Sequence, residues 1–293
     1  MKRLLSMLSA FFLLSLLAIF VWLTPMSTNF LNYMLWKYST DAPVVTGNID
    51  YRQAHIHYEV IGSGKPVLML HGGLSNKLCW FSQIPWLVKA GRQVVLVDTR
   101  GHGRSSRGSD VLSYEIFAED TLKVLDRLAI TRTDIVGWSD GGIIALLLGL
   151  QSPERVDRIV AISANFHPGG VIGGFDTPDP DVSYSLMNTL KSWFQVWWSG
   201  AGDRHAELEA ELNTLWQTQP QLKHSDLQAI AAPTLVIAGE NDIIDLPHSG
   251  EMAQMLAQGS IEIVLGAGHA SPFTHPEQIN QLIASFLQIP ITP

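Results

Sequence analysis

Residues 134–150 read DIVGWSDGGIIALLLGL: a short apolar run, a glycine-rich turn and a longer apolar run. The first run, Asp134–Val136, is typical of a buried strand, and the last run is typical of a helix. Between them, Gly137–Gly141 fits the pattern G-x-S-x-G, in which a sharp strand-to-helix turn exposes a serine hydroxyl above a sheet. The pattern alone arises by chance, but this strand-turn-helix context favours Ser139 as a nucleophile.

On both sides of this turn, short β-branched runs alternate with longer helical patterns. The expected strands are Ala54–Val60, Val67–Leu70, Val94–Val97, Asp134–Val136, Ile159–Ile162, Thr234–Ile237 and Ile261–Val264. The expected helices are Tyr114–Leu128, Gly141–Gln151, Ser249–Ala257 and Pro276–Leu287. Such alternation predicts an α/β fold, with a mostly parallel central sheet covered by helices on both faces.

One interval, residues 166–222, breaks the alternation. It contains no clear strand, and its leucines and tryptophans recur at helical spacing. We interpret it as a helical cap over one edge of the sheet, because long insertions of this kind are often lids. Of Trp193, Trp197 and Trp198, one or two are candidates for lining an apolar substrate pocket, and we select the first two. Aromatic residues at this spacing more often serve packing alone.

The composition bounds the class of protein. The chain has 293 residues, of which 46% are hydrophobic and 16% charged, and its formal net charge is −8. This length suits one α/β domain of about 250 residues plus extensions. An acidic chain without a basic cluster is a poor partner for nucleic acid. Because Cys79 is the single cysteine, a disulfide framework or cysteine-cluster metal site is excluded, and no cofactor is implied.

The N-terminal residues resemble a membrane anchor. Lys2 and Arg3 precede an uncharged run, residues 4–24, which would span about 31 Å as a helix. The run is longer than a signal-peptide core and lacks an Ala-x-Ala site. We therefore expect an uncleaved signal anchor in residues 1–24, with a cleaved secretory signal as the alternative.

The positive-inside rule then places the rest of the chain on the extracytoplasmic side, either periplasmic or extracellular. In this interpretation, residues 25–45 form a linker and residues 46–293 form the α/β domain with its cap.

A serine nucleophile needs an adjacent base, and the base needs an orienting carboxylate. His269 follows the last expected strand, at the carboxyl edge where α/β sheets place their sites. Asp242 follows Thr234–Ile237 at the same edge and is the favoured carboxylate. Glu240 and Asp245 remain as alternatives.

These residues occur in the order serine, aspartate, histidine, which is the chain order of α/β hydrolases. Two further segments resemble that family. Leu70–Gly73 (LHGG) is similar to its HG-x oxyanion loop, and Asp98–Ser105 (DTRGHGRS) is similar to its D-x-R-G-x-G-x-S loop. Residues 51–289 therefore resemble the α/β-hydrolase superfamily, specifically its compact members with one helical cap.

The resemblance implies a serine hydrolase that cleaves small-molecule carboxylic esters through an acyl-enzyme. Ser139 would attack the carbonyl, His269 would take its proton, and Asp242 would stabilise the imidazolium. The backbone N–H groups of Gly73 and Asp140 would form the oxyanion hole, each contributing about 3–4 kcal/mol. The sequence leaves the oligomeric state and the natural substrate undetermined.

Several activities remain as alternatives. Epoxide hydrolases and haloalkane dehalogenases of this fold use an aspartate nucleophile, so Ser139 disfavours them. The same triad serves C–C bond hydrolases, lactonases, thioesterases, haloperoxidases and aminopeptidases. A non-catalytic binding protein is disfavoured because all three triad residues are present.

Asp140 raises a separate question, since a carboxylate beside an oxyanion hole opposes the charge that the hole must hold. The segment GWSDGG resembles that of amino-acid-ester hydrolases related to the valacyclovir-hydrolysing enzyme. That resemblance implies that Asp140 binds a substrate amine. The alternative is that its side chain caps the helix or pairs with a neighbouring residue.

Overall fold

The computed structural model describes residues 25–172, 196 and 198–290. The chain divides into two compact units, residues 1–41 and 42–293. In the first unit, helix α2 (Pro25–Ser39) covers most of the segment expected to be a linker. No helix within the described ranges is both long and apolar enough to cross a membrane. The expected anchor, residues 4–24, lies outside those ranges.

The second unit is built on an eight-stranded sheet with the strand order β1-β2-β4-β3-β5-β6-β7-β8. Its strands are β1 (Val44–Tyr51), β2 (Ala54–Ile61), β3 (Lys65–Leu70), β4 (Arg92–Val97), β5 (Thr133–Trp138), β6 (Val156–Ile162), β7 (Thr234–Asn241) and β8 (Gly259–Gly268). Strand β2 pairs antiparallel with β1 and β4, and all other neighbours are parallel. This is the α/β-hydrolase fold.

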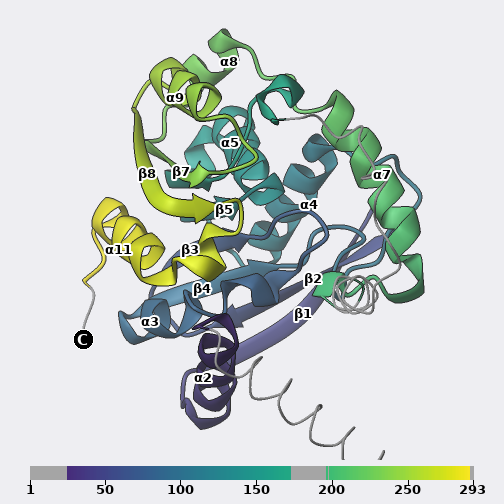
Figure 1. The fold of residues 1–293 in the computed structure, drawn as a ribbon. Coiled ribbons are helices and arrows are strands. Elements are labelled where there is room, and N and C mark those ends of the chain that lie inside the picture. The colour runs from purple at the N-terminus through teal and green to yellow at the C-terminus, as the bar shows by residue number, and fades with distance from the viewer. Residues whose placement is uncertain (1–24, 173–195, 197, 291–293) are drawn as a thin grey trace, which may run out of the picture. The chain divides into compact units, whose positions relative to one another are not determined.

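Helices cover the sheet on both sides. The described helices of this unit are α3 (Ile84–Lys89), α4 (Tyr114–Arg127), α5 (Asp140–Gln151), α7 (His205–Thr218), α8 (His224–Ala229), α9 (Leu246–Met255), α10 (Ser271–Thr274) and α11 (Pro276–Leu287). Figure 1 shows α4 and α5 on one face and α3 and α11 on the other. Strand β3 is therefore enclosed, and Val67–Leu70 are fully buried, as a near-continuous apolar run in a parallel sheet predicts.

The seven strands expected from the sequence are all present, and the four expected helices are present with ends that differ by up to three residues. Strand β1 was not predicted. It lies at the edge of the sheet and is largely exposed, and its sequence VVTGNIDY includes a glycine and an asparagine, so it lacks the apolar pattern of a buried strand. The short helix α3 was also missed, since six residues offer little helical periodicity.

The described part of the expected cap contains helix α7, whose Leu208, Leu212 and Leu215 form a buried stripe as their spacing predicted. Residues 173–195 and 197 lie outside the described ranges. Helix α7 packs on the loop after β4, where the Arg107 guanidinium pairs with Glu211 at 2.6 Å.

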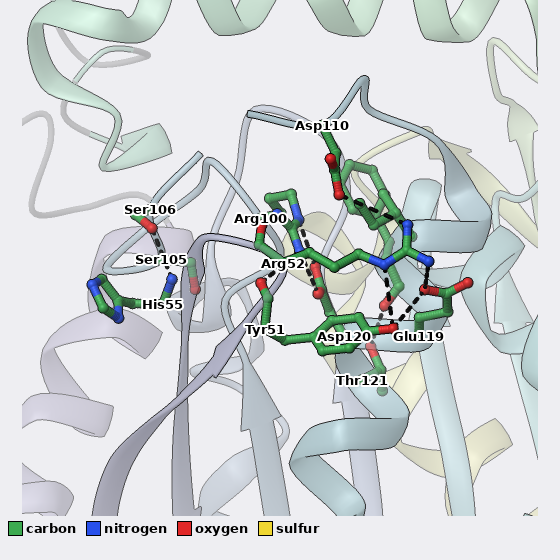
Figure 2. Close-up of polar contacts among 12 residues, drawn as sticks. Tyr51, Arg52, His55, Arg100, Ser105, Ser106, Asp110, Glu119, Asp120 and Thr121 are labelled. Atoms are coloured by element: carbon green, nitrogen blue, oxygen red, sulfur yellow. Dashed lines mark hydrogen bonds and ion pairs between the residues drawn. The ribbon is translucent and has the colours of Figure 1, made fainter. Parts of the chain in front are cut away.

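The loop after β4 is anchored by a buried arginine. The Arg100 side chain is fully buried and binds both carboxylate oxygens of Asp120 on α4, at 2.7 and 2.9 Å. It also donates to the carbonyl oxygens of Tyr51 and Arg52. Figure 2 shows this guanidinium between the β1–β2 turn and helix α4. Because truncating one partner of such a buried pair costs about 3–5 kcal/mol, this loop is held firmly.

The turn between β5 and α5 brings backbone segments into unusually close contact. Ser139 adopts φ 54° and ψ −121°, which is a strained conformation for a non-glycine residue. A Cβ atom added at Gly141 would lie 2.1 Å from the carbonyl oxygen of Leu70. Helix α5 therefore begins directly against the carboxyl end of β3, and glycine is required there for steric reasons.

We expect Gly141→Ala to destabilise the protein by about 1–3 kcal/mol, because the new methyl group overlaps backbone that cannot move aside. Gly250→Ala is the matched control. Gly250 lies within α9, and a Cβ atom there would meet nothing within 4 Å, so the control should gain about 0.5–1 kcal/mol. Urea unfolding of the two variants measures both values, and equal stabilities would contradict the expectation.

Candidate active site

Three side chains that follow different strands meet at the carboxyl edge of the sheet, above β5. Ser139 follows β5, Asp242 follows β7, and His269 follows β8. The Oγ atom of Ser139 lies 3.0 Å from His269 Nε2, and His269 Nδ1 lies 2.8 Å from Asp242 Oδ1. The structure thus brings together the three residues selected from the sequence, in a continuous chain of hydrogen-bond distances.

The proton positions in this chain follow from its chemistry. An ionised carboxylate only accepts hydrogen bonds, so His269 Nδ1 carries a proton and donates a hydrogen bond to Asp242. In the neutral ring, Nε2 is then an acceptor and accepts a hydrogen bond from the Ser139 hydroxyl. This tautomer is the one in which the imidazole can take a proton from the serine.

Asp242 is held as an anion. Its side chain is fully buried, and it accepts hydrogen bonds from the Ser163 hydroxyl at 2.5 Å and the Ile244 backbone N–H at 3.1 Å. Burial alone would raise the pKa of this carboxyl. The hydrogen bond and charge of His269, together with the bonds from Ser163 and Ile244, outweigh burial and hold the pKa below its ordinary value.

The histidine is also fixed through its backbone. The indole Nε1 of Trp138 donates to the carbonyl oxygen of His269 at 2.8 Å. Trp138 is the last residue of β5, next to the serine. The strand that carries the serine therefore also holds the loop that carries the histidine.

A cavity of about 190 Å³ opens over these side chains. It is lined by Gly73, Trp138, Ser139, Asp140, Asn165, Val171, Trp216, Ile243, Ile244 and His269. Its wall is apolar except for the serine, the histidine, Asn165 and Asp140. Of the pocket residues selected from the sequence, Trp193 and Trp197 lie outside the described residues, and Trp198 lines a separate cavity.

The two residues selected for the oxyanion hole border this cavity beside the serine. Asp140 is the first residue of α5, so its N–H is among those that an α-helix leaves without an intrahelical partner. Gly73 has no room for a side chain, since an added Cβ would lie 2.5 Å from Trp216 and 2.6 Å from Asp140 Oδ2. Both backbone N–H groups are therefore near the place where an oxyanion would form.

The Asp140 side chain pairs with neighbours rather than capping its helix. Its Oδ1 accepts from the Tyr114 hydroxyl at 2.8 Å and from Trp216 Nε1 at 2.9 Å, and Oδ2 lies 3.1 Å from the same indole nitrogen. Burial raises the pKa of Asp140 to about 6, although both hydrogen bonds oppose the shift. A carboxylate offers about four acceptor positions, so Oδ2 retains capacity for a further donor.

The hydrogen-bond partner of His269 Nδ1 is Asp242 and not one of the alternative carboxylates. Glu240 Oε2 accepts the backbone N–H of Gly266 at 2.8 Å, and Asp245 stands at the start of α9. Within the described ranges, no group of three His, Cys, Asp or Glu side chains could hold a metal ion.

Three contributors were missed by sequence reasoning. Ser163 supports Asp242, while Tyr114 and Trp216 bind Asp140. Ser163 follows β6, and its position at the carboxyl edge of the sheet was an available signal. Tyr114 and Trp216 come from α4 and α7, and no motif relates either residue to the turn that carries Ser139.

Comparison with known proteins agrees with this geometry. Residues 67–282 match the alpha/beta hydrolase family. The chain is 30% identical to the 2-hydroxy-6-oxononadienedioate/2-hydroxy-6-oxononatrienedioate hydrolase of Klebsiella pneumoniae, covering 80% of this chain and 92% of that protein. It is 28% identical to the sn-1-specific diacylglycerol lipase ABHD11 of Mus musculus, with coverage of 82% and 87%. It is 25% identical to a non-heme haloperoxidase of Rhodococcus erythropolis, with coverage of 80% and 96%.

The matched region spans more than half of the chain and includes the serine, the aspartate, the histidine and the LHGG loop. Its relatives differ in the reactions that their names describe, but they share one family. The chain is a member of the α/β-hydrolase family.

Proposed function

We propose that this protein is a serine hydrolase acting on carboxylic esters. The observation that carries the proposal is the hydrogen-bond chain from Ser139 through His269 to Asp242. This chain lies at the floor of an apolar cavity, beside two backbone N–H groups suited to an oxyanion. Each of these features is required for acyl transfer to a serine.

In the proposed reaction, the Ser139 hydroxyl oxygen bonds to the ester carbonyl carbon while its proton passes to His269 Nε2. The negative charge that develops on the carbonyl oxygen is stabilised by the N–H groups of Gly73 and Asp140. The tetrahedral intermediate collapses, the C–O bond breaks, and His269 returns the proton to the leaving alkoxide. Water then attacks the acyl-enzyme by the same route, which releases the acid and restores the serine.

The relatives point to two further candidates, since one is named as a hydrolase of 2-hydroxy-6-oxononadienedioate and 2-hydroxy-6-oxononatrienedioate and another as a non-heme haloperoxidase. The substrate in the name of the former is a dioate. In this chain the anionic or partly anionic Asp140 lines the cavity, and a buried carboxylate repels dianionic substrates. This arrangement favours neutral or cationic esters over dioates.

We also propose that the protein is anchored to a membrane by residues 4–24, with the hydrolase unit on the extracytoplasmic side. The support is the sequence pattern: an uncharged run of 21 residues preceded by Lys2 and Arg3. A cleaved signal peptide is the alternative for the same segment.

We expect Ser139→Ala to abolish both labelling by a fluorophosphonate probe and hydrolysis of an ester panel of varied acyl length. Loss of a triad serine typically lowers kcat by about 10⁶-fold. Ser285→Ala, which changes an exposed serine on α11, is the control and should retain both activities. Folded wild-type protein that neither reacts with the probe nor cleaves any ester would contradict the proposal.

The charge of Asp140 gives a second prediction. At pH 7 the benzyl ester of alanine should exceed benzyl propanoate in kcat/KM by about tenfold, because a charge-assisted hydrogen bond contributes about 1.5–3 kcal/mol. The ratio should fall as the pH drops from 7 to 5. The pKa of Asp140 is about 6, so the carboxyl gains a proton and loses its attraction for the ammonium group. Any change with pH that affects both esters alike cancels in this ratio.

Two variants test this interpretation. Asp140→Asn should bring the ratio near one at every pH, whereas Glu207→Gln, an exposed carboxylate on α7, should leave it unchanged. Equal rates for the two esters in the wild type at pH 7 would rule out amine recognition by Asp140.

The anchor proposal predicts that the full-length chain stays in the membrane pellet after alkaline carbonate extraction. Replacing Leu14 and Leu17 by arginine should move it to the supernatant, because each charge at a helix centre costs about 2.5–3.5 kcal/mol. Intact mass then separates the alternatives. A shortened soluble wild-type chain would indicate a cleaved signal, and a full-length soluble wild-type chain would refute both.

A further inference from the structure

A buried hydrogen-bond network joins the LHGG loop to the loop after β4. The network consists of His71, Thr99 and His102, each at least nine-tenths buried. His71 Nε2 lies 3.0 Å from the backbone nitrogen of Thr99 and 3.2 Å from its Oγ1. Thr99 Oγ1 in turn lies 3.1 Å from His102 Nδ1. The two rings are 5.1 Å apart between centroids.

One end of this network binds the backbone of the LHGG loop, and the other binds the residue that follows it. His71 Nδ1 lies 2.7 Å from the carbonyl oxygen of Gly72, and the backbone N–H of Leu74 donates to His102 Nε2 at 3.1 Å. The carbonyl of the Gly72–Gly73 peptide group thus accepts a hydrogen bond from His71. The N–H of the following peptide group, Gly73–Leu74, donates a hydrogen bond to His102.

Every proton in the network can be assigned. The carbonyl oxygens of Gly72 and Arg100 only accept, so His71 and His102 each carry their proton on Nδ1. His102 Nδ1–H therefore also faces Thr99 Oγ1, which accepts from it. His71 Nε2 carries no proton, so it accepts the Thr99 backbone N–H at 3.0 Å and faces the Thr99 hydroxyl as a second donor at 3.2 Å. The hydrogen bonds are therefore donated in one direction, from His102 through Thr99 and His71 to the Gly72 carbonyl.

The charge state of both rings is fixed by their surroundings. Burial, followed by the neighbouring His71, lowers the pKa of His102 to about 3. Burial also lowers the pKa of His71. Both rings stay neutral near pH 7, so the two Nε2 atoms remain acceptors throughout the ordinary working range.

The hydrogen bond from His71 also sets the direction of the Gly73 N–H, which belongs to the candidate oxyanion hole. In a trans peptide, the carbonyl and the N–H point in opposite directions. The bond from His71 to the Gly72 carbonyl therefore turns the Gly73 N–H away from the histidine pair, and Gly73 lines the cavity beside Ser139. Hydrogen bonding at the carbonyl also polarises the same peptide and strengthens its N–H as a donor.

The adjacent backbone is strained and needs such support. Leu74 adopts φ 52°, a left-handed conformation that costs about 1–3 kcal/mol for a non-glycine residue. Its N–H is the group that His102 accepts. The loop that supplies His102 is itself anchored by Arg100 and by Ser105 and Ser106, whose hydroxyls accept backbone N–H groups of β2. Figure 2 shows the bond that Ser106 accepts from His55.

We propose that His102 and Thr99 are positioning residues of the oxyanion hole, acting through the Leu74 N–H and through His71 on the Gly72–Gly73 peptide. Neither residue lines the cavity at Ser139, so their effect is exerted through the backbone. The proposal rests on the proposed function to the extent that it takes the Gly73 N–H as an oxyanion donor.

The first test removes only the hydroxyl that links the two rings. Thr99→Val should lower kcat for ester hydrolysis about tenfold with KM unchanged, because an oxyanion forms only in the transition state. Loss of a whole donor typically costs about 10²–10³-fold, and a misaligned donor costs less. Thr121→Val is the matched control: Thr121 is also fully buried, but its hydroxyl binds the Phe117 carbonyl within α4. It should retain wild-type kcat.

The second test replaces the ring that holds Leu74. His102→Leu removes the acceptor, and we expect kcat to fall about 10–100-fold. His102→Gln keeps a carboxamide oxygen within reach of the Leu74 N–H and should recover most of that loss. The proposal would be overturned if Thr99→Val and His102→Leu both fold, match the thermal stability of the Thr121→Val control and keep the wild-type kcat.

A spectroscopic measurement is independent of catalysis. Nuclear magnetic resonance of ¹⁵N-histidine-labelled protein should show His71 and His102 as neutral Nδ1–H tautomers. The Gly73 amide resonance should shift in Thr99→Val but not in Thr121→Val. A proton on Nε2 of either ring, or an unmoved Gly73 amide, would overturn the inference even if ester hydrolysis is confirmed. The two proposals can fail separately. If the spectra are as expected but the protein reacts with neither esters nor the fluorophosphonate, this inference is supported and the proposed function is refuted.

Discussion

The site depends on one close backbone contact, where the start of α5 lies against the carboxyl end of β3. Gly141 allows this approach, because any side chain there would overlap the Leu70 carbonyl. The contact places the N-terminus of α5, with Ser139 before it, directly beside the LHGG loop. The nucleophile and the candidate oxyanion donors are thus brought together by main chain alone, and the side chains around them refine an arrangement that the backbone already defines.

Electrostatics distinguishes the two carboxylates of the site. Asp242 receives hydrogen bonds from Ser163, Ile244 and a cationic or proton-donating partner in His269, which together lower its pKa. Asp140 has only the neutral donors Tyr114 and Trp216 as hydrogen-bond partners in the described residues, and burial raises its pKa. One carboxylate is therefore suited to stabilising an imidazolium, whereas the other responds to the charge of whatever occupies the cavity.

Much of this architecture could be predicted from the sequence. The central strands have strong periodic patterns, the turn Gly137–Gly141 has a recognisable motif, and the chain order led to Ser139, Asp242 and His269. Strand β1 was missed because an exposed edge strand has no apolar pattern. Tyr114 and Trp216 were missed as partners of Asp140 because they come from helices distant in sequence, and only tertiary packing brings them together. The histidine network could not be predicted from the sequence either, since His71 and His102 lie 31 residues apart and are linked through Thr99.

The bond from the Trp138 indole to the His269 carbonyl has a mechanical consequence. Trp138 and Ser139 are consecutive, so a displacement of the end of β5 moves the nucleophile and the support of the histidine loop together. Motions of the sheet that would otherwise separate the two groups become common to both, and their relative position is preserved. The distance between Ser139 and His269 therefore changes little when the end of the strand moves. Changes in the cap can alter access to the cavity without altering the positions of these two residues relative to each other.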